Sequence, residues 1–375
     1  MLQRPPAEPG MGEDEIDTPA LVLDLDAFEA NLAAMARSLE ASAVALRPHA
    51  KTHKSPVIAH RQMAHGAVGQ CVQKVSEAEI LAWGGVTDIL VTNEIVGAPK
   101  LARLAALARI ARIGVCADHV DQIAALEKAA SEAGVTLNVY VEIDVGAARC
   151  GVVSPDEAVD LAQRIADSRA LVFAGLQAYH GSAQHLRAVG ERRAAIGSAV
   201  ATARRTMEAL DRAGLPCPAV TGAGTGTFEI ERDSGIYTEL QAGSYCFMDA
   251  DYGRNLDADG NPVSLFRPAL FVLGTVMSVT RAGRAVIDVG HKGVGIDSGL
   301  PVLWDRPDIA YVGASDEHGQ LAFAPSHNGA LRLGEKIRLV PGHCDPTVDR
   351  YDWYVGVRSG RVECLWPIAA RGAMA

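Results

Sequence analysis

The chain has no apolar run that approaches the roughly 20 residues of a membrane-spanning helix. Residues 1–19 are rich in proline, glycine and acidic side chains and lack the apolar core of a secretory signal. A basic excess is also missing, because the formal net charge is −10. This balance argues against general binding to nucleic acid or to a membrane surface. We therefore expect neither kind of partner.

Cysteine pairs with CxxC spacing are absent as well. The seven cysteines are an odd, scattered set, so the sequence does not indicate a disulfide framework. Reduced thiols of this kind are typical of the cytoplasm, where we expect the protein.

Short apolar runs alternate with helical stretches from residue 20 to about 250. Eight candidate strands follow a first helical pattern at 27–42, namely 44–48, 67–73, 88–94, 112–118, 137–145, 171–179, 218–224 and 237–243. Such alternation indicates βα units and a parallel sheet. Eight strands over this length predict a closed (β/α)₈ TIM-type barrel, although an open doubly wound sheet has the same periodicity.

After about residue 262 the chain consists of β-rich runs broken by glycine-containing turns. This pattern predicts a second, mostly antiparallel β domain in an α/β protein. The polar stretch 251–264 contains the boundary. We predict an N-terminal segment (1–24) that packs on the β domain, a cofactor-binding barrel (25–258) and the β domain itself (259–375).

A cluster of basic side chains stands out in this acidic chain: Arg47, His49, Lys51, His53 and Lys54. If the segment is extended, its alternate members point to one side. The cluster could bind an anionic polymer, or it could hold a lysine as an amine nucleophile. The acidic balance weakens the first interpretation. Nearby cations and partial burial would lower the pKa of Lys51 and increase its free amine form, with the two histidines as support.

Polar residues gather after the predicted strands, where one rim of a barrel would lie. Asp144 and Arg149 follow the fifth strand, and Tyr179, His180 and His185 follow the sixth. The sequence therefore predicts a functional site at this rim.

Two small-residue turns follow the last two strands. Residues 222–227, GAGTGT, offer closely spaced N–H groups that can form an anion nest. They match neither a dinucleotide fingerprint nor a P-loop. The second turn is Gly243-Ser244-Tyr245. Either turn alone is more typical of an ordinary barrel connection, but both together, beside an isolated lysine, favour one phosphate group.

A His-x-Asp motif stands near the C-terminus. On an extended chain, His343 and Asp345 point the same way while Cys344 points the opposite way. Pro346 biases Asp345 away from the helical region. One imidazole and one carboxylate make half of a divalent metal site and favour Mn²⁺ or Mg²⁺ over Zn²⁺. A loop histidine beside a surface aspartate is the alternative.

Seven motifs in register resemble those of D-threonine aldolases: RPHAKTHK, QKVSEAE, VEIDVGAARCG, LQAYHGSAQH, TGAGTG, LQAGSYCFMDADYG and PGHCDPT. These enzymes belong to the alanine-racemase-like, fold-type III pyridoxal-phosphate enzymes, together with 3-hydroxy-D-aspartate aldolases and D-serine dehydratases. The resemblance extends from about Thr18 to Gly372. It implies pyridoxal 5'-phosphate and a divalent metal as cofactors. It also implies a homodimer with the active site near the subunit interface.

The resemblance also implies roles for individual residues. Lys51 matches the Schiff-base lysine, and His343 and Asp345 match the metal ligands. His185 matches a histidine near the substrate hydroxyl and has the chemistry of a general base, although a metal-bound water could serve instead. The implied cofactor-binding residues are Lys51, Gln73, Arg149 near the phenolic oxygen, Tyr179 near the pyridine nitrogen, Thr221, Gly224, Thr225, Gly226, Gly243, Ser244 and Tyr245. His180, Asp316, Glu317 and His318 lie in family motifs without an assigned role.

The implied reaction is retro-aldol cleavage of D-threonine and related β-hydroxy-D-amino acids to glycine and an aldehyde. A 3-hydroxy-D-aspartate aldolase is an alternative, with Arg254 or Arg350 for the second carboxylate. A D-serine or D-threonine dehydratase is another, although D-serine dehydratases have a cysteine where this chain has Asp345. A racemase does not need the metal pair. A pyridoxal-phosphate homeostasis protein without a reaction would lack both the metal pair and the β domain.

Overall fold

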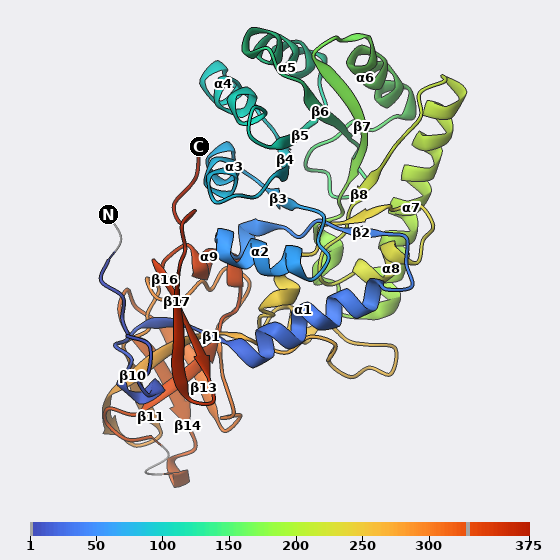
Figure 1. The fold of residues 1–375 in the computed structure, drawn as a ribbon. Coiled ribbons are helices and arrows are strands. Elements are labelled where there is room, and N and C mark those ends of the chain that lie inside the picture. The colour runs from blue at the N-terminus through green and yellow to red at the C-terminus, as the bar shows by residue number, and fades with distance from the viewer. Residues whose placement is uncertain (1–2, 328–330) are drawn as a thin grey trace.

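The computed structural model describes residues 3–327 and 331–375, so residues 1–2 of the predicted N-terminal segment lie outside it. A helix-covered barrel and a β domain lie against each other (Figure 1). Among the residues described, no helix has both the length and the apolar character needed to cross a membrane.

The barrel is built on an eight-stranded parallel sheet with the order β2-β9-β8-β7-β6-β5-β4-β3. A parallel bridge between His49 and Cys71 joins the two edge segments. The predicted (β/α)₈ barrel is confirmed. The strands are β2 (Ala45–Leu46), β3 (Gln70–Val72), β4 (Asp88–Glu94), β5 (Arg112–Ala117), β6 (Leu137–Glu142), β7 (Leu171–Ala178), β8 (Val220–Gly222) and β9 (Glu239–Leu240).

Local capping signals set the ends of the barrel helices. The Asp24 side chain accepts from the N–H of Ala27 at the start of α1. Ser154 and Glu157 form a capping box at the start of α6, with Pro155 in the first turn. The helices are α1 (Leu25–Leu39), α2 (Pro56–Ala64), α3 (Val75–Trp83), α4 (Ala98–Leu107), α5 (Val120–Ala133), α6 (Pro155–Asp167), α7 (Val189–Arg212) and α8 (Phe228–Arg232).

The second unit is a nine-stranded sheet that also includes β1 (Ala20–Asp24). Strand β1 pairs antiparallel with β10 and parallel with β16. The predicted antiparallel β domain is confirmed, and the exact domain limits stay a prediction. The remaining strands are β10 (Leu270–Arg281), β11 (Arg284–Ile287), β12 (Val302–Leu303), β13 (Ile309–Ala314), β14 (Gly319–Phe323), β15 (Lys336–Val340), β16 (Trp353–Arg358) and β17 (Arg361–Pro367).

The two units share one hydrophobic core. Phe28 of α1 and Phe247 of the barrel pack in the same cluster as Tyr354 of β16, and the Phe247 and Tyr354 rings lie 5.6 Å apart. Short helix α9 (Cys344–Val348) follows β15 and contacts the 3₁₀ turn Ala50–Thr52 of the barrel. The core therefore holds α9 of the β domain against the segment that carries Lys51.

Candidate active site

A cavity of about 450 Å³ lies at the C-terminal ends of the barrel strands. It is lined by residues from the loops that follow β2, β3, β6, β7, β8 and β9. The structure brings together nine of the candidate residues here: Lys51, Gln73, Arg149, Tyr179, His185, Gly224, Thr225, Gly243 and Ser244.

Three predicted cofactor contacts do not line this cavity. Thr221 donates to Glu239 Oε1 inside the barrel at 2.8 Å. The N–H of Gly226 is already used by Gln184 Oε1 at 3.0 Å. The Tyr245 side chain is buried in the hydrophobic core. Internal packing or hydrogen bonds occupy these groups here, and cofactor contact by Thr221, Gly226 and Tyr245 stays a prediction.

The basic segment is not extended throughout, because residues Ala50–Thr52 form a 3₁₀ helix. Its charges are separately neutralised. Arg47 forms ion pairs with Glu239 and Asp88 at 3.0 and 2.6 Å. Lys54 is buried and forms ion pairs with Glu77 and Asp349. The cations therefore do not form a common patch.

The expectation of a lowered pKa for Lys51 is also wrong. Burial acts to lower this pKa, but Asp345, whose Oδ2 accepts from Nζ at 2.6 Å, outweighs it and raises the pKa. Burial keeps the neighbouring imidazoles neutral: it lowers the pKa of His53 to about 4 and that of His49 well below its usual range. In this structure the lysine faces an anion and neutral rings.

The metal-ligand pair does meet, but not through the predicted extended geometry. His343 is extended, with φ −149° and ψ 124°, whereas Asp345 lies in the first turn of α9. Pro346 is tolerated there because N–H groups of a first helical turn have no intrahelical partner. His343 Nε2 lies 4.0 Å from Asp345 Oδ2. A helix N-terminus therefore brings the two donors together.

Two further features of this pair fit the predicted binding of an ion. Asp297 Oδ2 lies 2.7 Å from His343 Nδ1, which leaves Nε2 as the free ring nitrogen. Asp345 Oδ1 is buried without a hydrogen-bond partner among the residues described. Burial raises the pKa of Asp345, but Lys51 and His343 outweigh this effect and hold it well below its usual range. The carboxylate is thus ionised and has one oxygen unused.

The two predicted metal ligands lie next to the barrel cavity. His343 and Asp345 line a neighbouring hollow of about 410 Å³, and Lys51 and Gln73 line both spaces. Arg350 lines this hollow as well.

The predicted phosphate turns are closely packed. A Cβ on Gly224 would meet Gln184 Oε1 at 2.6 Å, and one on Gly243 would meet the carbonyl oxygen of His49 at 2.5 Å. The Thr225 hydroxyl, in the first of these turns, is buried without a hydrogen-bond partner among the described residues. A buried, unpartnered hydroxyl that lines a cavity fits an anionic ligand.

Arg149 reaches the cavity from the loop after β6. Its guanidinium lies over the Tyr179 ring at 5.6 Å and 3.5 Å from Glu142. Burial, and then the neighbouring Glu94, raise the pKa of Glu142. Arg149 is therefore held between an aromatic face and a buried carboxyl group.

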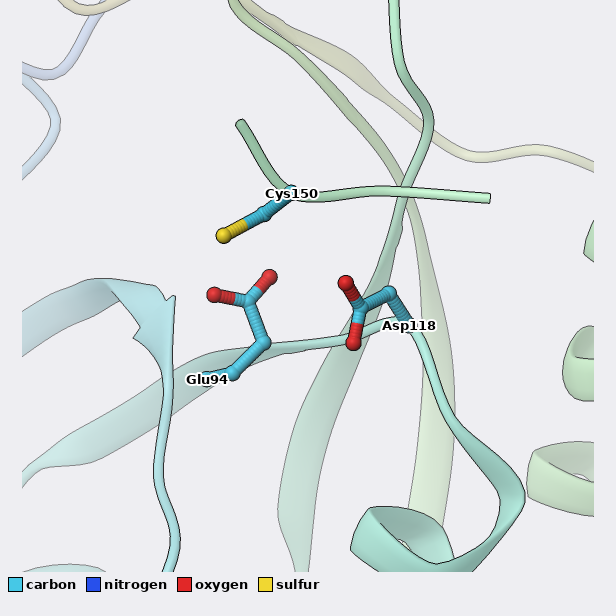
Figure 2. A group of neighbouring side chains, drawn as sticks. All are labelled: Glu94, Asp118 and Cys150. Carbon is cyan, nitrogen blue, oxygen red and sulfur yellow. The ribbon is translucent and has the colours of Figure 1, made fainter. Parts of the chain in front are cut away.

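A polar cluster fastens this loop (Figure 2). Glu94, Asp118 and Cys150 bring ligand-type atoms within 4.8 Å of one another. Asp118 also accepts from the N–H of Gly151 at 2.9 Å and from Gln122 at 3.0 Å. These bonds tie the loop after β6 to the end of β5, which supports the position of Arg149.

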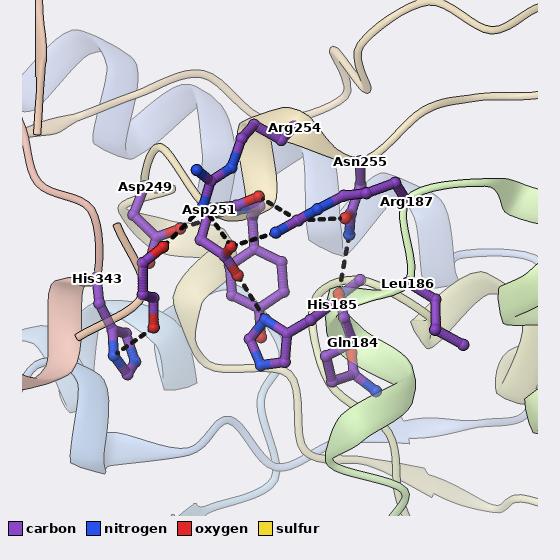
Figure 3. A network of polar contacts seen from close by, with 12 residues as sticks. Gln184, His185, Leu186, Arg187, Asp249, Asp251, Arg254, Asn255 and His343 are labelled. Atoms are coloured by element: carbon purple, nitrogen blue, oxygen red, sulfur yellow. Dashed lines mark hydrogen bonds and ion pairs between the residues drawn. The ribbon is translucent and has the colours of Figure 1, made fainter. Parts of the chain in front are cut away.

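The His185 ring is held by an aspartate (Figure 3). Its Nδ1 lies 2.5 Å from Asp251 Oδ2, and its ring stacks on Tyr252 with 6.1 Å between centroids. Burial raises the pKa of Asp251, but hydrogen bonds from Arg187, Arg254 and His185 outweigh it and lower the pKa. Asp251 is an ionised partner of the histidine.

Several residues of the site are absent from the sequence-based prediction. Thr92 contacts His49 Nε2 and Gln73 at 3.0 and 3.1 Å, and Thr52, Gln177, Gln241 and Tyr252 also line the cavity. Thr92, Gln177 and Gln241 stand in or directly after a strand, so the rule used for Arg149 could have found them. Asp251 and Asp297 lie in polar loops, and nothing in the sequence indicates which histidine each would meet.

The unassigned motif residues lie elsewhere. His180 contacts Ser182 at 3.3 Å and does not line the cavity. Glu317, in the turn between β13 and β14, pairs with Lys292, and Asp316 and His318 flank it.

Comparisons with known proteins agree with this architecture. Residues 23–251 match the family described as "Alanine racemase, N-terminal domain", and residues 269–357 match "Putative serine dehydratase domain". A 3-hydroxy-D-aspartate aldolase of Paracoccus denitrificans (strain Pd 1222) is 47% identical, over 98% of this chain and 95% of that protein. A D-threonine aldolase of Arthrobacter sp is 47% identical, over 98% and 96%. The crystal structure of D-threonine aldolase from Filomicrobium marinum superimposes with a TM-score of 0.96 at 50% identity and covers 100% of both chains.

A barrel of this type with an appended β domain defines the alanine-racemase-like class. The chain belongs to this family, in the group that contains D-threonine aldolase and 3-hydroxy-D-aspartate aldolase.

Proposed function

We propose that the protein is a pyridoxal-phosphate-dependent aldolase that cleaves D-threonine and related β-hydroxy-D-amino acids to glycine and an aldehyde. A divalent ion, Mn²⁺ or Mg²⁺, would be the second cofactor. One observation carries the proposal: the amine of Lys51 and the carboxylate of Asp345 meet at 2.6 Å, where two hollows join. The names of the relatives support the same activity. We further propose a cytoplasmic homodimer.

Lys51 would hold pyridoxal phosphate through its amine. The unpartnered Thr225 hydroxyl and the tightly packed Gly224 and Gly243 turns fit its phosphate group. Arg149 and Tyr179 are the proposed contacts of the ring, and Gln73 is a third. When bound, this cofactor supplies an electron sink for the α-carbon of an amino acid.

His343 and Asp345 would hold the divalent ion. One imidazole nitrogen and a carboxylate with a free oxygen are a donor set that Mn²⁺ or Mg²⁺ accepts together with water. When bound, such an ion acts as a Lewis acid toward the substrate β-hydroxyl.

His185 would move the proton of the reaction. Nδ1 faces Asp251, so Nε2 is the nitrogen that would accept the β-hydroxyl proton. The O–H electron pair then becomes part of the aldehyde carbonyl as the Cα–Cβ bond breaks. Protonation of the remaining α-carbon gives glycine.

Product analysis with D-threonine tests the proposal. The enzyme is loaded with pyridoxal phosphate and assayed with Mn²⁺ or with a chelator. Glycine and acetaldehyde that disappear with the chelator are the expected result. Ammonia and 2-oxobutyrate would instead identify a dehydratase, and L-allothreonine, the product of inversion at the α-carbon alone, a racemase. Unchanged D-threonine would favour a homeostasis protein.

3-Hydroxy-D-aspartate is a second candidate substrate, because Arg350 lines the hollow beside the metal pair. Its guanidinium could pair with a side-chain carboxylate. Arg350→Gln should then lower kcat/KM for 3-hydroxy-D-aspartate and leave that for D-threonine nearly unchanged. Arg284→Gln, at an exposed position of β11, is the control. Equal losses on both substrates would exclude Arg350 from side-chain recognition.

A further inference from the structure

The contact between His185 and Asp251 fixes which ring nitrogen carries a proton. The Asp251 carboxylate can only accept hydrogen bonds, and it lies 2.5 Å from Nδ1. A neutral His185 must therefore be protonated at Nδ1, which leaves the lone pair on Nε2. Because His185 lines the cavity, this lone pair is available to a bound substrate.

Asp251 is in turn fixed from its other side. Its side chain is only 5% exposed, and Oδ1 accepts from Arg187 Nη2 at 2.5 Å and from Arg254 Nη2 at 2.7 Å (Figure 3). Two cationic donors on one oxygen keep the carboxylate ionised and hold its plane. The second oxygen, Oδ2, is thereby directed to His185.

The same network also contacts the backbone next to His185. Arg187 also donates to Asn255 Oδ1 at 2.9 Å, and Asn255 Nδ2 donates to the carbonyl oxygen of Gln184 at 3.0 Å. The Tyr252 ring stacks on the imidazole. Both the backbone and the ring of His185 are consequently held by residues 251–255.

We propose that Asp251 is a positioning residue that holds His185 with Nε2 free and stabilises the imidazolium formed when Nε2 accepts the β-hydroxyl proton. This inference rests on the proposed function. The proton moves from the substrate oxygen to Nε2, while Asp251 stays ionised and takes up no proton. When the product leaves, the imidazolium returns its proton to solvent.

A purely structural role is the competing explanation, since the network also ties the loop 184–187 to 251–255. The two roles differ in how substitutions combine. If Asp251 acts through His185, its loss has no further effect once the imidazole is gone. If it only stabilises the loops, the two losses multiply.

A double-mutant cycle on the holoenzyme decides between them. Wild type, Asp251→Asn, His185→Ala and the double variant are assayed with D-threonine at saturating Mn²⁺. We expect Asp251→Asn to lower kcat by about 10²-fold, with KM and the visible absorbance of the bound cofactor little changed. The kcat of the double variant should lie within about threefold of the kcat of His185→Ala. Asp251→Glu, which keeps the carboxylate, should recover part of the activity.

Asp352→Asn is the matched control. Asp352 is also an almost fully buried carboxylate paired with an arginine, Arg371 at 2.5 Å, but it lies away from the cavity. This variant should retain wild-type kcat.

Three results would overturn the inference alone, in a wild type that does release acetaldehyde. These are an unchanged kcat in Asp251→Asn, a multiplicative loss in the double variant, and full activity in His185→Ala. A wild type that releases no aldehyde from D-threonine would instead overturn the proposed function, and this inference with it.

Discussion

His185 and His343 approach the active site from two different domains, and each has an aspartate at Nδ1. The two aspartates differ in their surroundings. The Asp251 side chain is 5% exposed and bonded to two arginines, whereas that of Asp297 is 53% exposed. A buried, ionised carboxylate suits an imidazole that must become positively charged. An exposed one orients its imidazole with less effect on its charge.

The environment of Nε2 differs as well. His343 Nε2 has Asp345 Oδ2 at 4.0 Å, so two donors converge on one point. The His185 side chain lines the cavity, and its ring stacks on the Tyr252 ring. Each histidine thus has an aspartate at Nδ1, and under the proposed function the group near Nε2 decides whether the ring binds an ion or accepts a proton.

The largest expected effects separate these two roles. His343→Ala should lower turnover by about 10³-fold or more, because the Lewis acid is lost. His185→Ala should lower kcat by 10²- to 10⁴-fold, roughly the contribution of a general base, and keep the metal. Calorimetric titration of each variant with Mn²⁺ measures the difference. A loss of Mn²⁺ affinity in His185→Ala would remove the distinction between the two histidines.

Asp297→Ala sharpens the comparison with Asp251. Loss of a carboxylate behind a ligating histidine weakens metal affinity by about 10- to 100-fold. At saturating Mn²⁺ the kcat should return close to the wild-type value, because Asp297 does not hold the base. Asp251→Asn should stay slow under the same conditions. If both variants recovered with added metal, Asp251 would have the same role as Asp297.

Much of this fold can be predicted from the sequence, but less of the site can. Alternating strands and helices predict the barrel, because each βα unit carries its own pattern of apolar spacing. Lys51, Arg149, Tyr179 and His185 end up in one cavity because the C-terminal ends of parallel strands meet at one rim. This rule uses only the order of elements.

The partners of Lys51 and His185 could not be predicted, since they come from distant segments. Asp345 reaches Lys51 across 294 positions, and it does so from a helix where Pro346 suggests an extended chain. The anion beside Lys51 reverses the expected direction of its pKa. Which charges neutralise a basic segment depends on tertiary packing, and periodicity contains no information on it.

A third histidine, His53, provides a contrast to His185 and His343, because no aspartate in the described part of the chain forms a hydrogen bond with its ring. His53 is fully buried, and its Nε2 has no hydrogen-bond partner among the residues described. Burial lowers its pKa to about 4, against 6.5 for an unperturbed imidazole. At a pH between these two values, His53 is protonated in the unfolded chain but neutral in the native state. The free energy of unfolding therefore falls as pH falls. From pH 7 to pH 5 this contribution is about 2 kcal/mol.

His53→Asn should remove that part of the pH dependence, while Oδ1 can still accept from the N–H of Ser55 as Nδ1 does at 3.1 Å. Urea denaturation at pH 5 and pH 7 measures it. His65→Asn, at an exposed position after α2, should leave the dependence as in wild type. An unchanged slope in His53→Asn would mean that this ring titrates normally although it lacks an aspartate.

The smallest expected effect tests whether cofactor binding in the barrel cavity is independent of metal binding by His343 and Asp345. Thr225→Val keeps the shape of the side chain and removes the unpartnered hydroxyl. A neutral hydrogen bond contributes about 0.5–1.5 kcal/mol, so pyridoxal phosphate should bind roughly 2- to 10-fold more weakly. Thr206→Val is the control, because this buried threonine bonds only its own helix, through the carbonyl oxygen of Thr202. Absorbance titration of the apoenzyme measures cofactor affinity, and Mn²⁺ affinity should not change. A parallel loss of Mn²⁺ affinity would mean that the two halves of the site form together. The separate roles of His185 and His343 would then hold only in the assembled holoenzyme.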